Sequence, residues 1–207
     1  MAQKLDVSPT RGVLLELRRE LDRISNGHEL LDRKRLALMR NLMERLDEAE
    51  DVQRRVREAF RDAREATRWA RMRVGTGRLE DVGRQPTADV EVRLSSRNLM
   101  GVRVPVVDLD ISPRDLPYGP ADTSAAVDEA RMRWLEVVRM LAELAEAVTT
   151  VWRLATELRK TQRRVNALES IVIPRYEETV DSIESVLEEE EREDILRARK
   201  VKEMRQR

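Results

Sequence analysis

The histidine His28 opens the run His28-Glu29-Leu30-Leu31-Asp32 and is the only one in the chain. This run begins like the helical motif of zinc proteases, in which two histidines four positions apart bind the metal. Asp32 stands where the second imidazole is needed, so the run does not predict a zinc site. Because His28 falls within an apolar stripe, we interpret it as a hydrogen-bonded core or interface residue.

Closely spaced glycines at Gly75, Gly77 and Gly83 are a second pattern that could bind a ligand, in this case a phosphate. A phosphate-binding loop needs a lysine followed by serine or threonine after its last glycine, and a strand before its first. This segment has neither the lysine nor a preceding strand pattern. A turn at the end of a helix accounts for these glycines better.

The remaining polar residues do not form a catalytic pattern. The chain lacks cysteine, which removes thiolate nucleophiles, thiolate metal ligands and disulfides together. No serine lies in the pattern of a nucleophile elbow. The carboxylates alternate with arginines at three- and four-residue spacings, which is typical of solvated helix faces. We expect no catalytic residue, no cofactor and no metal, and therefore no enzymatic activity in this chain alone.

Nucleic-acid binding would use stacking aromatics and phosphate-binding cations. Trp69, Trp134 and Trp152 could stack on bases, and the cluster Arg33-Lys34-Arg35 could contact phosphates. However, Trp134 falls within an apolar stripe and Trp152 beside it, so we interpret the tryptophans as core residues. The 40 basic and 40 acidic residues cancel, which leaves no general attraction for a polyanion.

The composition favours long helices as the elements that carry these residues. Charged residues make up 39% of the 207 positions and aromatics only 3%, with 7 glycines and 7 prolines. This balance is typical of coiled coils and too poor in rings for a compact core. No stretch approaches a membrane span, and the N-terminus lacks the apolar run of a secretion signal. We expect a cytoplasmic protein without direct membrane insertion.

A first long helix is predicted by apolar residues at alternating spacings of three and four. Thr10 is a suitable start, because its hydroxyl can accept from the first free N–H groups, and Gly75 is a suitable end. Only His28, Arg35 and Arg45 interrupt the stripe, and arginines at such positions indicate that a further surface covers the seam. The stripe consists of Leu14, Leu17, Leu21, Ile24, His28, Leu31, Arg35, Leu38, Leu42, Arg45, Ala49, Val52, Val56, Ala59, Ala63, Ala66 and Ala70.

A second long helix is predicted from Asp122 or Thr123 onwards. Pro174 lacks the N–H and crowds the preceding turn, so it bends the helix or begins a new one, and we favour a bend. Beyond the run of glutamates at 188–191 the pattern weakens to an exposed helical tail. The stripe consists of Val127, Ala130, Trp134, Val137, Leu141, Leu144, Val148, Val151, Ala155, Leu158, Gln162, Val165, Val172, Tyr176, Thr179, Ile183 and Val186.

Between the helices, alternating apolar residues predict a small β-hairpin at about 89–107. Pro105 cannot donate to a ladder, so the second strand lies at an edge, and Pro113, Pro117 and Pro120 support an extended lead into the second helix. We divide the chain into a helix (1–74), a connector (75–121) and a helix (122–207). Because each helix alone leaves its stripe in water, we predict an all-α dominated fold, an antiparallel two-helix coiled coil with a hairpin connector.

Two stretches resemble the D subunit of V/A-type ATPases, a central-stalk protein. The first is Ser8-Pro9-Thr10-Arg11 with Gly27-His28-Glu29-Leu30-Leu31 and Arg33-Lys34-Arg35, which is similar to the N-terminal helix of that family. The second is Arg163-Arg164-Val165-Asn166-Ala167-Leu168-Glu169 with Ile173-Pro174, which looks like its C-terminal helix. The resemblance covers both helices and the overall length, while the hairpin segment matches in layout more than in residues.

The resemblance implies a non-catalytic rotor axle that couples ATP synthesis or hydrolysis to proton or sodium transport. The implied partners are the catalytic and non-catalytic subunits of the ATPase hexamer, the F subunit of the stalk and the socket subunit above the membrane rotor. The implied location is peripheral to the cell membrane through the complex. The candidate partner contacts by this resemblance are Pro9, Thr10, Arg11, His28, Arg33, Lys34, Arg35, Arg163, Arg164, Asn166, Glu169 and Pro174.

Two other classes share the seam and the lack of catalytic motifs. A free-standing coiled-coil scaffold or regulatory adaptor is the first alternative. A scaffold of this kind would not need both signature stretches on opposite helices with a hairpin between them. A nucleic-acid-binding coiled coil is the second, and the net charge of zero weighs against it.

Overall fold

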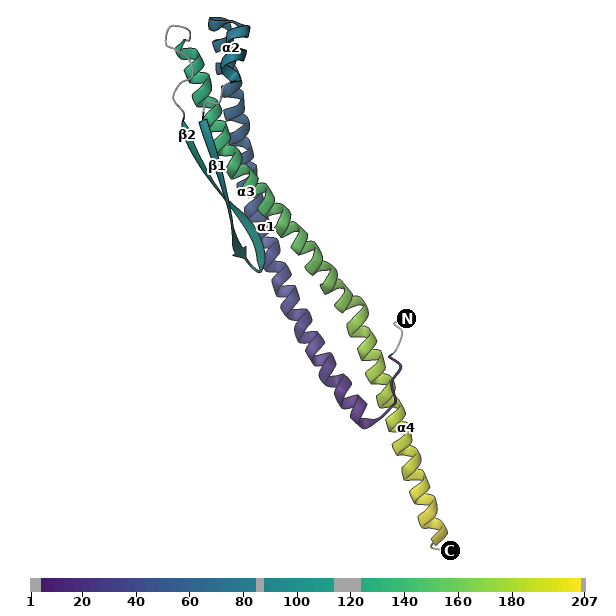
Figure 1. Ribbon diagram of the computed structural model, residues 1–207. Helices are drawn as coiled ribbons and strands as arrows, with labels where there is room; N and C mark the ends of the chain where they lie inside the picture. The colour runs from purple at the N-terminus through teal and green to yellow at the C-terminus, as the bar shows by residue number, and fades with distance from the viewer. Residues whose placement is uncertain (1–4, 85–87, 114–123, 206–207) are drawn as a thin grey trace. The chain divides into compact units, whose positions relative to one another are not determined.

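The structure, a computed structural model, describes residues 5–84, 88–113 and 124–205. Long helices dominate it, and two strands form one antiparallel hairpin, which confirms the predicted fold class. The described helices do not include one that is both long and apolar enough to cross a membrane. In chain order the elements are α1 (Arg11–Val74), α2 (Thr76–Gly83), β1 (Ala88–Leu99), β2 (Val102–Pro113), α3 (Ala125–Ala167), the π-helical turn η1 (Leu168–Val172) and α4 (Ile173–Arg205) (Figure 1).

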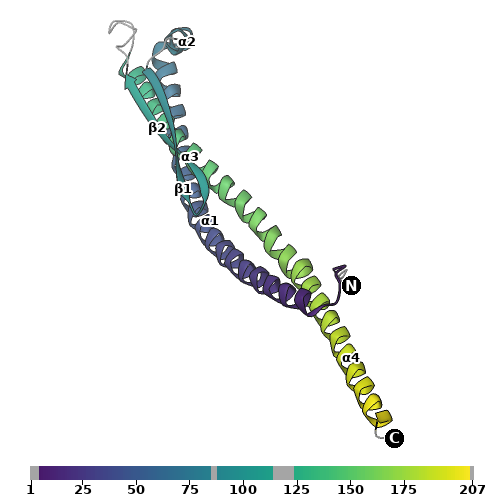
Figure 2. The same ribbon diagram turned by 60° about the horizontal axis from the view of Figure 1, so that its bottom comes forward.

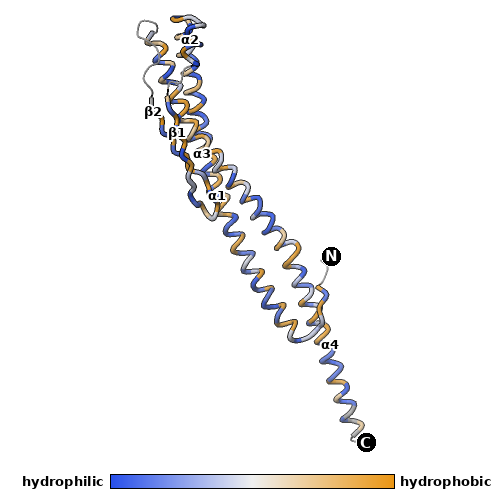
Figure 3. The backbone as a smooth tube through the Cα atoms, viewed as in Figure 1, coloured by the Kyte–Doolittle hydropathy of each residue, from blue (hydrophilic) through white to orange (hydrophobic). Residues whose placement is uncertain are grey.

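The chain divides into two compact units. The first unit comprises Met1–Ala37 and Leu158–Arg207, and the second comprises Leu38–Glu157. Helices α1 and α3 each contribute to both units. Along each helix, hydrophilic and apolar residues alternate, as expected of surface helices that bury one stripe (Figure 3).

The first unit pairs the beginning of α1 with α4 in antiparallel directions (Figures 1 and 2). Its core consists of Leu17, Val180 and Ile183, all of them buried. Full burial of an aliphatic side chain contributes about 1.5–3 kcal/mol, so these contacts hold the two helices together. Before the helix, the backbone N–H of Leu5 donates to Thr179 Oγ1 at 3.1 Å, which ties the N-terminal segment to α4.

Helix α1 begins where the sequence predicts. Thr10 Oγ1 accepts a hydrogen bond from the backbone N–H of Val13 at 3.3 Å, and its carbonyl accepts from the N–H of Leu14 at 2.9 Å. The hydroxyl therefore satisfies one of the free N–H groups of the first turn. At the other end, Gly75 has φ 86°, a conformation that few residues other than glycine adopt readily, and α1 ends there.

The second unit pairs the rest of α1 with α3. Ala70, Val127 and Ala130 form a buried cluster, and their small side chains let the two helices approach closely. The predicted start of the second helix lies outside the described residues, as do Pro117 and Pro120; α3 begins at Ala125. Further along the seam the most buried side chains are Leu38, Val56, Ala63, Val137 and Leu154.

Every predicted stripe position of α1 is buried or half-buried, which confirms that stripe. In the second long helix part of the predicted stripe is wrong. Leu141 and Val148 of α3 and Val186 of α4 are exposed, whereas Thr150 and Leu154 are buried. A strict seven-residue count drifts by roughly 20° per repeat relative to a straight helix, so it loses the buried face over several turns.

The exposure of two tryptophans contradicts the interpretation of all three as core residues. Trp69 and Trp152 are exposed, so they are not core residues. Trp134 is at the margin of the seam, where its ring meets Phe60 edge-on with centroids 5.3 Å apart. Its indole N–H donates to Thr67 Oγ1 at 2.9 Å, which satisfies its polar atom.

Pro174 does not break the second helix. The turn before it is π-helical, and the backbone N–H of Ile173 donates to the carbonyl of Leu168, five residues back. A proline at position 174 removes the next helical donor and crowds the preceding turn, and the wider π turn accommodates that crowding. The helical backbone therefore continues from Ala125 to Arg205.

The hairpin, with strands Ala88–Leu99 and Val102–Pro113, is longer than the predicted 89–107. Its register runs from Ala88 opposite Pro113 to Leu99 opposite Val102, with a two-residue turn between them. Met100 has φ 53° and Gly101 has φ 83°, and two positive φ angles are the mark of a type I′ turn. Val102 and Val104 are buried, and they anchor the turn end of the hairpin.

Candidate partner interface

All the contact residues predicted from the sequence lie in the first unit. The structure sorts them into residues that join the helices and residues that face outwards. The group comprises Pro9, Thr10, Arg11, His28, Arg33, Lys34, Arg35, Arg163, Arg164, Asn166, Glu169 and Pro174.

Arg35 joins the helices rather than facing outwards. Its Nη1 donates to Gln162 Oε1 at 3.3 Å, and Gln162 Nε2 donates to Asn166 Oδ1 at 2.6 Å. Its Nη2 lies 2.6 Å from Asp32 Oδ1. The half-buried guanidinium is therefore neutralised and bonded across the seam, as a charge at that depth requires. Arg35 therefore connects α1 to α3 through Gln162, and Asn166, itself exposed, bonds to Gln162 within α3.

His28 is half-buried on the same side of α1. Its Nε2 atom is buried and has no hydrogen-bond partner among the described residues. Within residues 5–84, 88–113 and 124–205, no three His, Cys, Asp or Glu side chains are grouped to hold a metal ion. His28 is thus half-buried as a stripe residue should be, but Nε2 makes no hydrogen bond with the described residues, so the structure does not show the predicted hydrogen bond at this atom.

Most of the charged residues among the predicted partner contacts face outwards. Arg33 pairs with Glu29 one turn away, and Arg11 pairs with Glu191 on α4. Exposed pairs of this kind contribute at most about 1 kcal/mol each, so a partner can replace them easily. Arg163 and Arg164 are exposed side by side on α3.

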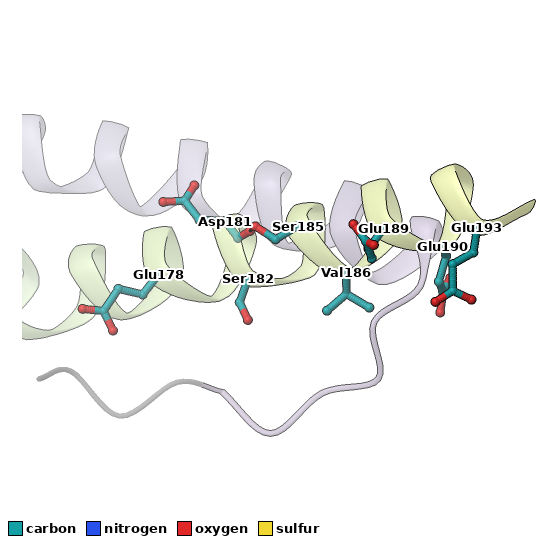
Figure 4. Close-up of a pocket in the computed structure, with 8 residues that line it drawn as sticks. All are labelled: Glu178, Asp181, Ser182, Ser185, Val186, Glu189, Glu190 and Glu193. Carbon is teal, nitrogen blue, oxygen red and sulfur yellow. Dashed lines mark hydrogen bonds between the residues drawn. The ribbon is translucent and has the colours of Figure 1, made fainter. Parts of the chain in front are cut away.

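Helix α4 presents an acidic surface hollow of about 710 Å³ in the first unit. Figure 4 shows carboxylates spread along successive turns around Ser182, Ser185 and Val186. The carboxylates do not converge on one point, so they form a charged surface and not an acid–base site. They belong to Glu178, Asp181, Glu189, Glu190 and Glu193.

The second unit contains an apolar surface that the sequence reasoning missed. On α1 it comprises Met39, Met43 and Leu46, spaced four and three residues apart and all exposed. On α3 it comprises Leu141, Val148 and Trp152, and Trp152 is 67% exposed. We call these residues the apolar face. Contiguous exposed apolar side chains of this size mark interaction sites on soluble proteins.

Helix geometry places both parts of the apolar face opposite the hairpin. Asn41 Nδ2 lies 3.3 Å from Met100 Sδ in the hairpin turn, and Met39 and Met43 are each two residues from Asn41. Two residues correspond to roughly 200° around an α-helix, so these methionines point the other way. On α3, Glu146 accepts from the hairpin, and Val148 lies two residues further on.

The two parts meet at one level of the helix pair. Arg55 of α1 pairs with Glu143 of α3 at 3.3 Å, which sets the antiparallel register. Leu46 precedes Arg55 by as many residues as Trp152 follows Glu143. Leu46 and Trp152 are therefore level with each other, and the two exposed stripes extend from there in opposite directions, Met39 and Met43 along α1 and Val148 and Leu141 along α3. The sequence does contain a signal for the apolar face, because Met39, Met43 and Leu46 form a second apolar stripe of α1 beside the seam stripe.

Comparison with known proteins gives consistent matches along the chain. The family model described as the D subunit of ATP synthase matches residues 13–203. The A-type ATP synthase D subunit of Pyrococcus furiosus is 41% identical, over 98% of this chain and 96% of that protein. The V-type ATP synthase D subunit of Thermotoga neapolitana is 33% identical over 96% and 98%. The A-type D subunit of Methanopyrus kandleri is 37% identical over 96% and 87%.

Proposed function

Because this chain belongs to the family of ATP synthase D subunits, we propose that it is the central axle of a V/A-type rotary ATPase. In this role it transmits torque between a catalytic hexamer and a membrane rotor, and so couples ATP synthesis or hydrolysis to proton or sodium transport. It binds no nucleotide itself and associates with the cytoplasmic side of the cell membrane through the complex.

The observation that carries the proposal is the construction of each unit. In each unit two antiparallel helices bury a shared apolar stripe, and the second helix continues through Pro174 without a break. A shaft that transmits torque needs such a seam, because close-packed side chains resist twisting and sliding of one helix on the other. The seams of the two units thus supply the stiffness that the proposed role requires.

The outer surface suits a shaft that turns within a ring. Along both units the exposed ion pairs are mostly between residues three or four apart on one helix, such as Arg33 with Glu29 and Arg54 with Asp51. Such pairs are weak and exchange readily with pairs to another protein. We assign the outward-facing cations of the first unit, including Arg33 and Arg164, to contacts with the hexamer that change as the shaft turns.

The apolar face suits a partner that rotates together with the shaft. Burial of Met43, Val148 and Trp152 would hold a subunit permanently, because apolar contacts do not exchange with water as surface ion pairs do. We assign the apolar face to the small F subunit of the stalk. The socket subunit above the membrane rotor is the remaining partner of the proposed axle.

Purification from native membranes tests the proposal. The tagged chain is recovered in mild detergent, its partners are identified by mass, and ATPase activity is measured in the eluate. We expect large nucleotide-binding subunits and inhibitor-sensitive ATPase activity. Recovery of the chain alone, or with unrelated proteins, would refute the axle and favour a free-standing scaffold.

Charge reversal tests the contact assignment separately. The double variant Arg33→Glu/Arg164→Glu should assemble but couple ATP turnover to ion transport less efficiently. Arg54→Glu is the matched control, because Arg54 has a similar exposed pair but lies outside the predicted contacts. Wild-type coupling in the double variant would contradict the assignment of these cations and leave the axle itself standing.

A further inference from the structure

The hairpin has two outer edges, and its register shows which backbone groups point out of each. Leu99 and Val102 close a two-residue turn, so they form a hydrogen-bonded pair. Bonded and non-bonded pairs alternate in an antiparallel ladder. The N–H and C=O groups of the alternate pairs therefore point outwards, and these pairs are Asn98 with Arg103, Ser96 with Pro105, Leu94 with Val107, and Val92 with Leu109.

The outer edge of β2 is already covered near the turn. Arg153 Nη1 donates to the carbonyl of Arg103 at 2.7 Å, and Glu146 Oε2 accepts from the N–H of Val107 at 3.1 Å. Pro105, between them, has no N–H to satisfy. Two side chains of α3 and one proline thus protect this edge, in the manner by which soluble proteins avoid edge-to-edge pairing.

Near the turn, the outer edge of β1 lies on the other side of the hairpin from these α3 contacts, whereas Val90 at the far end lines a hollow with Thr67 and Trp134 of the helices. At the levels of Arg103 and Val107 the edge of β2 faces α3, so the edge of β1 at Asn98 and Leu94 faces away from it. Residues 89–98 are all exposed, and Leu94 is 74% exposed. In the described parts of the chain, no backbone hydrogen bond joins this edge to another element.

The edge of β1 has neither a proline nor a bulge to protect it. The strand sequence contains no proline, and its register with β2 is regular throughout, so no extra residue twists the edge away. Instead, Val90, Val92 and Leu94 place exposed apolar side chains at every second position. A long, regular edge with apolar side chains on one face is what an added strand requires, because the backbone supplies affinity and the alternate side chains supply specificity.

We propose that the outer edge of β1 accepts an extended segment of a partner protein as a third strand of this sheet. One side of the added strand would meet Val92 and Leu94. The other side would meet Glu91 and Arg93, with Asp108 and Asp110 of β2 beyond them, so that carboxylates outnumber the guanidinium. The segment that fits alternates branched apolar residues with lysine or arginine.

Carboxylates surround Arg93 on this side of the hairpin. The hydrogen bond from Arg93 to Glu91, together with the fields of Asp108 and Asp110, raises the pKa of Arg93 above its ordinary value. An acidic segment would meet these carboxylates directly across the sheet, and like charges opposite each other destabilise a strand pair. The site is distinct from the apolar face, which lies on the opposite side of the helices.

A proline substitution at one position tests the proposal. The N–H of Ser96 points outwards, so Ser96→Pro removes an edge donor without removing a bond of the hairpin. Ser96→Ala is the matched control, because it keeps the N–H. The probe is a fluorescent eight-residue peptide of alternating valine and lysine, and its binding to the full chain is measured by anisotropy.

We expect the wild type and Ser96→Ala to bind the peptide equally. Ser96→Pro should bind at least about tenfold more weakly, because one neutral hydrogen bond is lost and the ring crowds the added strand. A peptide of alternating valine and glutamate should not bind. Equal binding by Ser96→Pro, or no binding of the lysine peptide to the wild type, would overturn the proposal.

Hydrogen exchange gives a readout that does not depend on any variant. The amides of Val92, Leu94 and Ser96 should exchange rapidly in the free chain and slow at least tenfold when the peptide is bound. The inward amides of Arg93 and Arg97 should change little. Slowing of both sets alike, or of neither, would show that the peptide does not add to this edge.

Discussion

Two valines of α3, Val137 and Val148, test the seam directly, because the heptad count places both in it and the structure buries only one. Val137 is 1% exposed and Val148 is 53% exposed. Both lie in the second unit and in the same helix, so Val→Ala at each is a matched pair. The same atoms are removed from a close-packed site in one case and from a surface in the other.

The expected magnitudes follow from burial and helix propensity. Removing two buried methyl groups at Val137 costs about 1.6 kcal/mol of transfer free energy, and the cavity raises this to about 2 kcal/mol. Alanine is the better helix former by about 0.5 kcal/mol, which leaves a net loss of about 1.5 kcal/mol. At Val148, which is half exposed, the substitution loses only about 0.8 kcal/mol of transfer free energy. The gain of about 0.5 kcal/mol in helix propensity offsets most of that loss.

The assay is urea unfolding of the full chain followed by circular dichroism at the helix band. We expect Val137→Ala to unfold at a lower urea concentration with an unchanged slope, and Val148→Ala to stay within about 0.5 kcal/mol of the wild type. Equal losses at the two positions would refute the assigned seam and restore the heptad count. A larger loss at Val148 would mean that the buried face of α3 is the opposite one.

Three further variants probe other features. Gly101→Ala should increase amide exchange in the hairpin several-fold, because alanine is strained at φ 83° by roughly 1 kcal/mol, and exchange equal to that of the wild type would contradict the type I′ turn. Glu146→Ala should expose the amide of Val107 to faster exchange without changing the helix content; protection that persists would mean that Glu146 does not hold the hairpin. Met43→Glu with Trp152→Ala should abolish co-purification of a small partner while the urea midpoint of the free chain stays nearly unchanged, and a full yield of the partner would argue against the apolar face as its site.

The hairpin shows how far local sequence patterns reach. Alternating apolar residues locate the two strands, because this signal acts within a few residues, whereas the two-residue turn at Met100 and Gly101 comes from the structure. Which edge of the hairpin is covered depends on Glu146 and Arg153, which are far away in the sequence. No pattern within the hairpin predicts these two contacts.

The predicted partner contacts also show what the sequence alone does not separate. The family resemblance selects Arg33, Arg35 and Asn166 alike, since all three match the signature stretches. The structure separates them, because Arg35 and Asn166 meet through Gln162 across the seam, whereas Arg33 pairs on the surface with its own helix. A side chain's role depends on what faces it, and a one-dimensional match does not contain that information.

The sequence by itself determined the fold class, the stripe of α1, the start at Thr10, the end at Gly75 and the family, because each rests on spacing or identity along one segment. Only the tertiary structure decided that Leu154 is buried while Val148 and Trp152 are exposed. The physical reason is that burial is a property of two surfaces. A helix carries several apolar stripes, and the face that its partner covers is set by the twist and register of the pair.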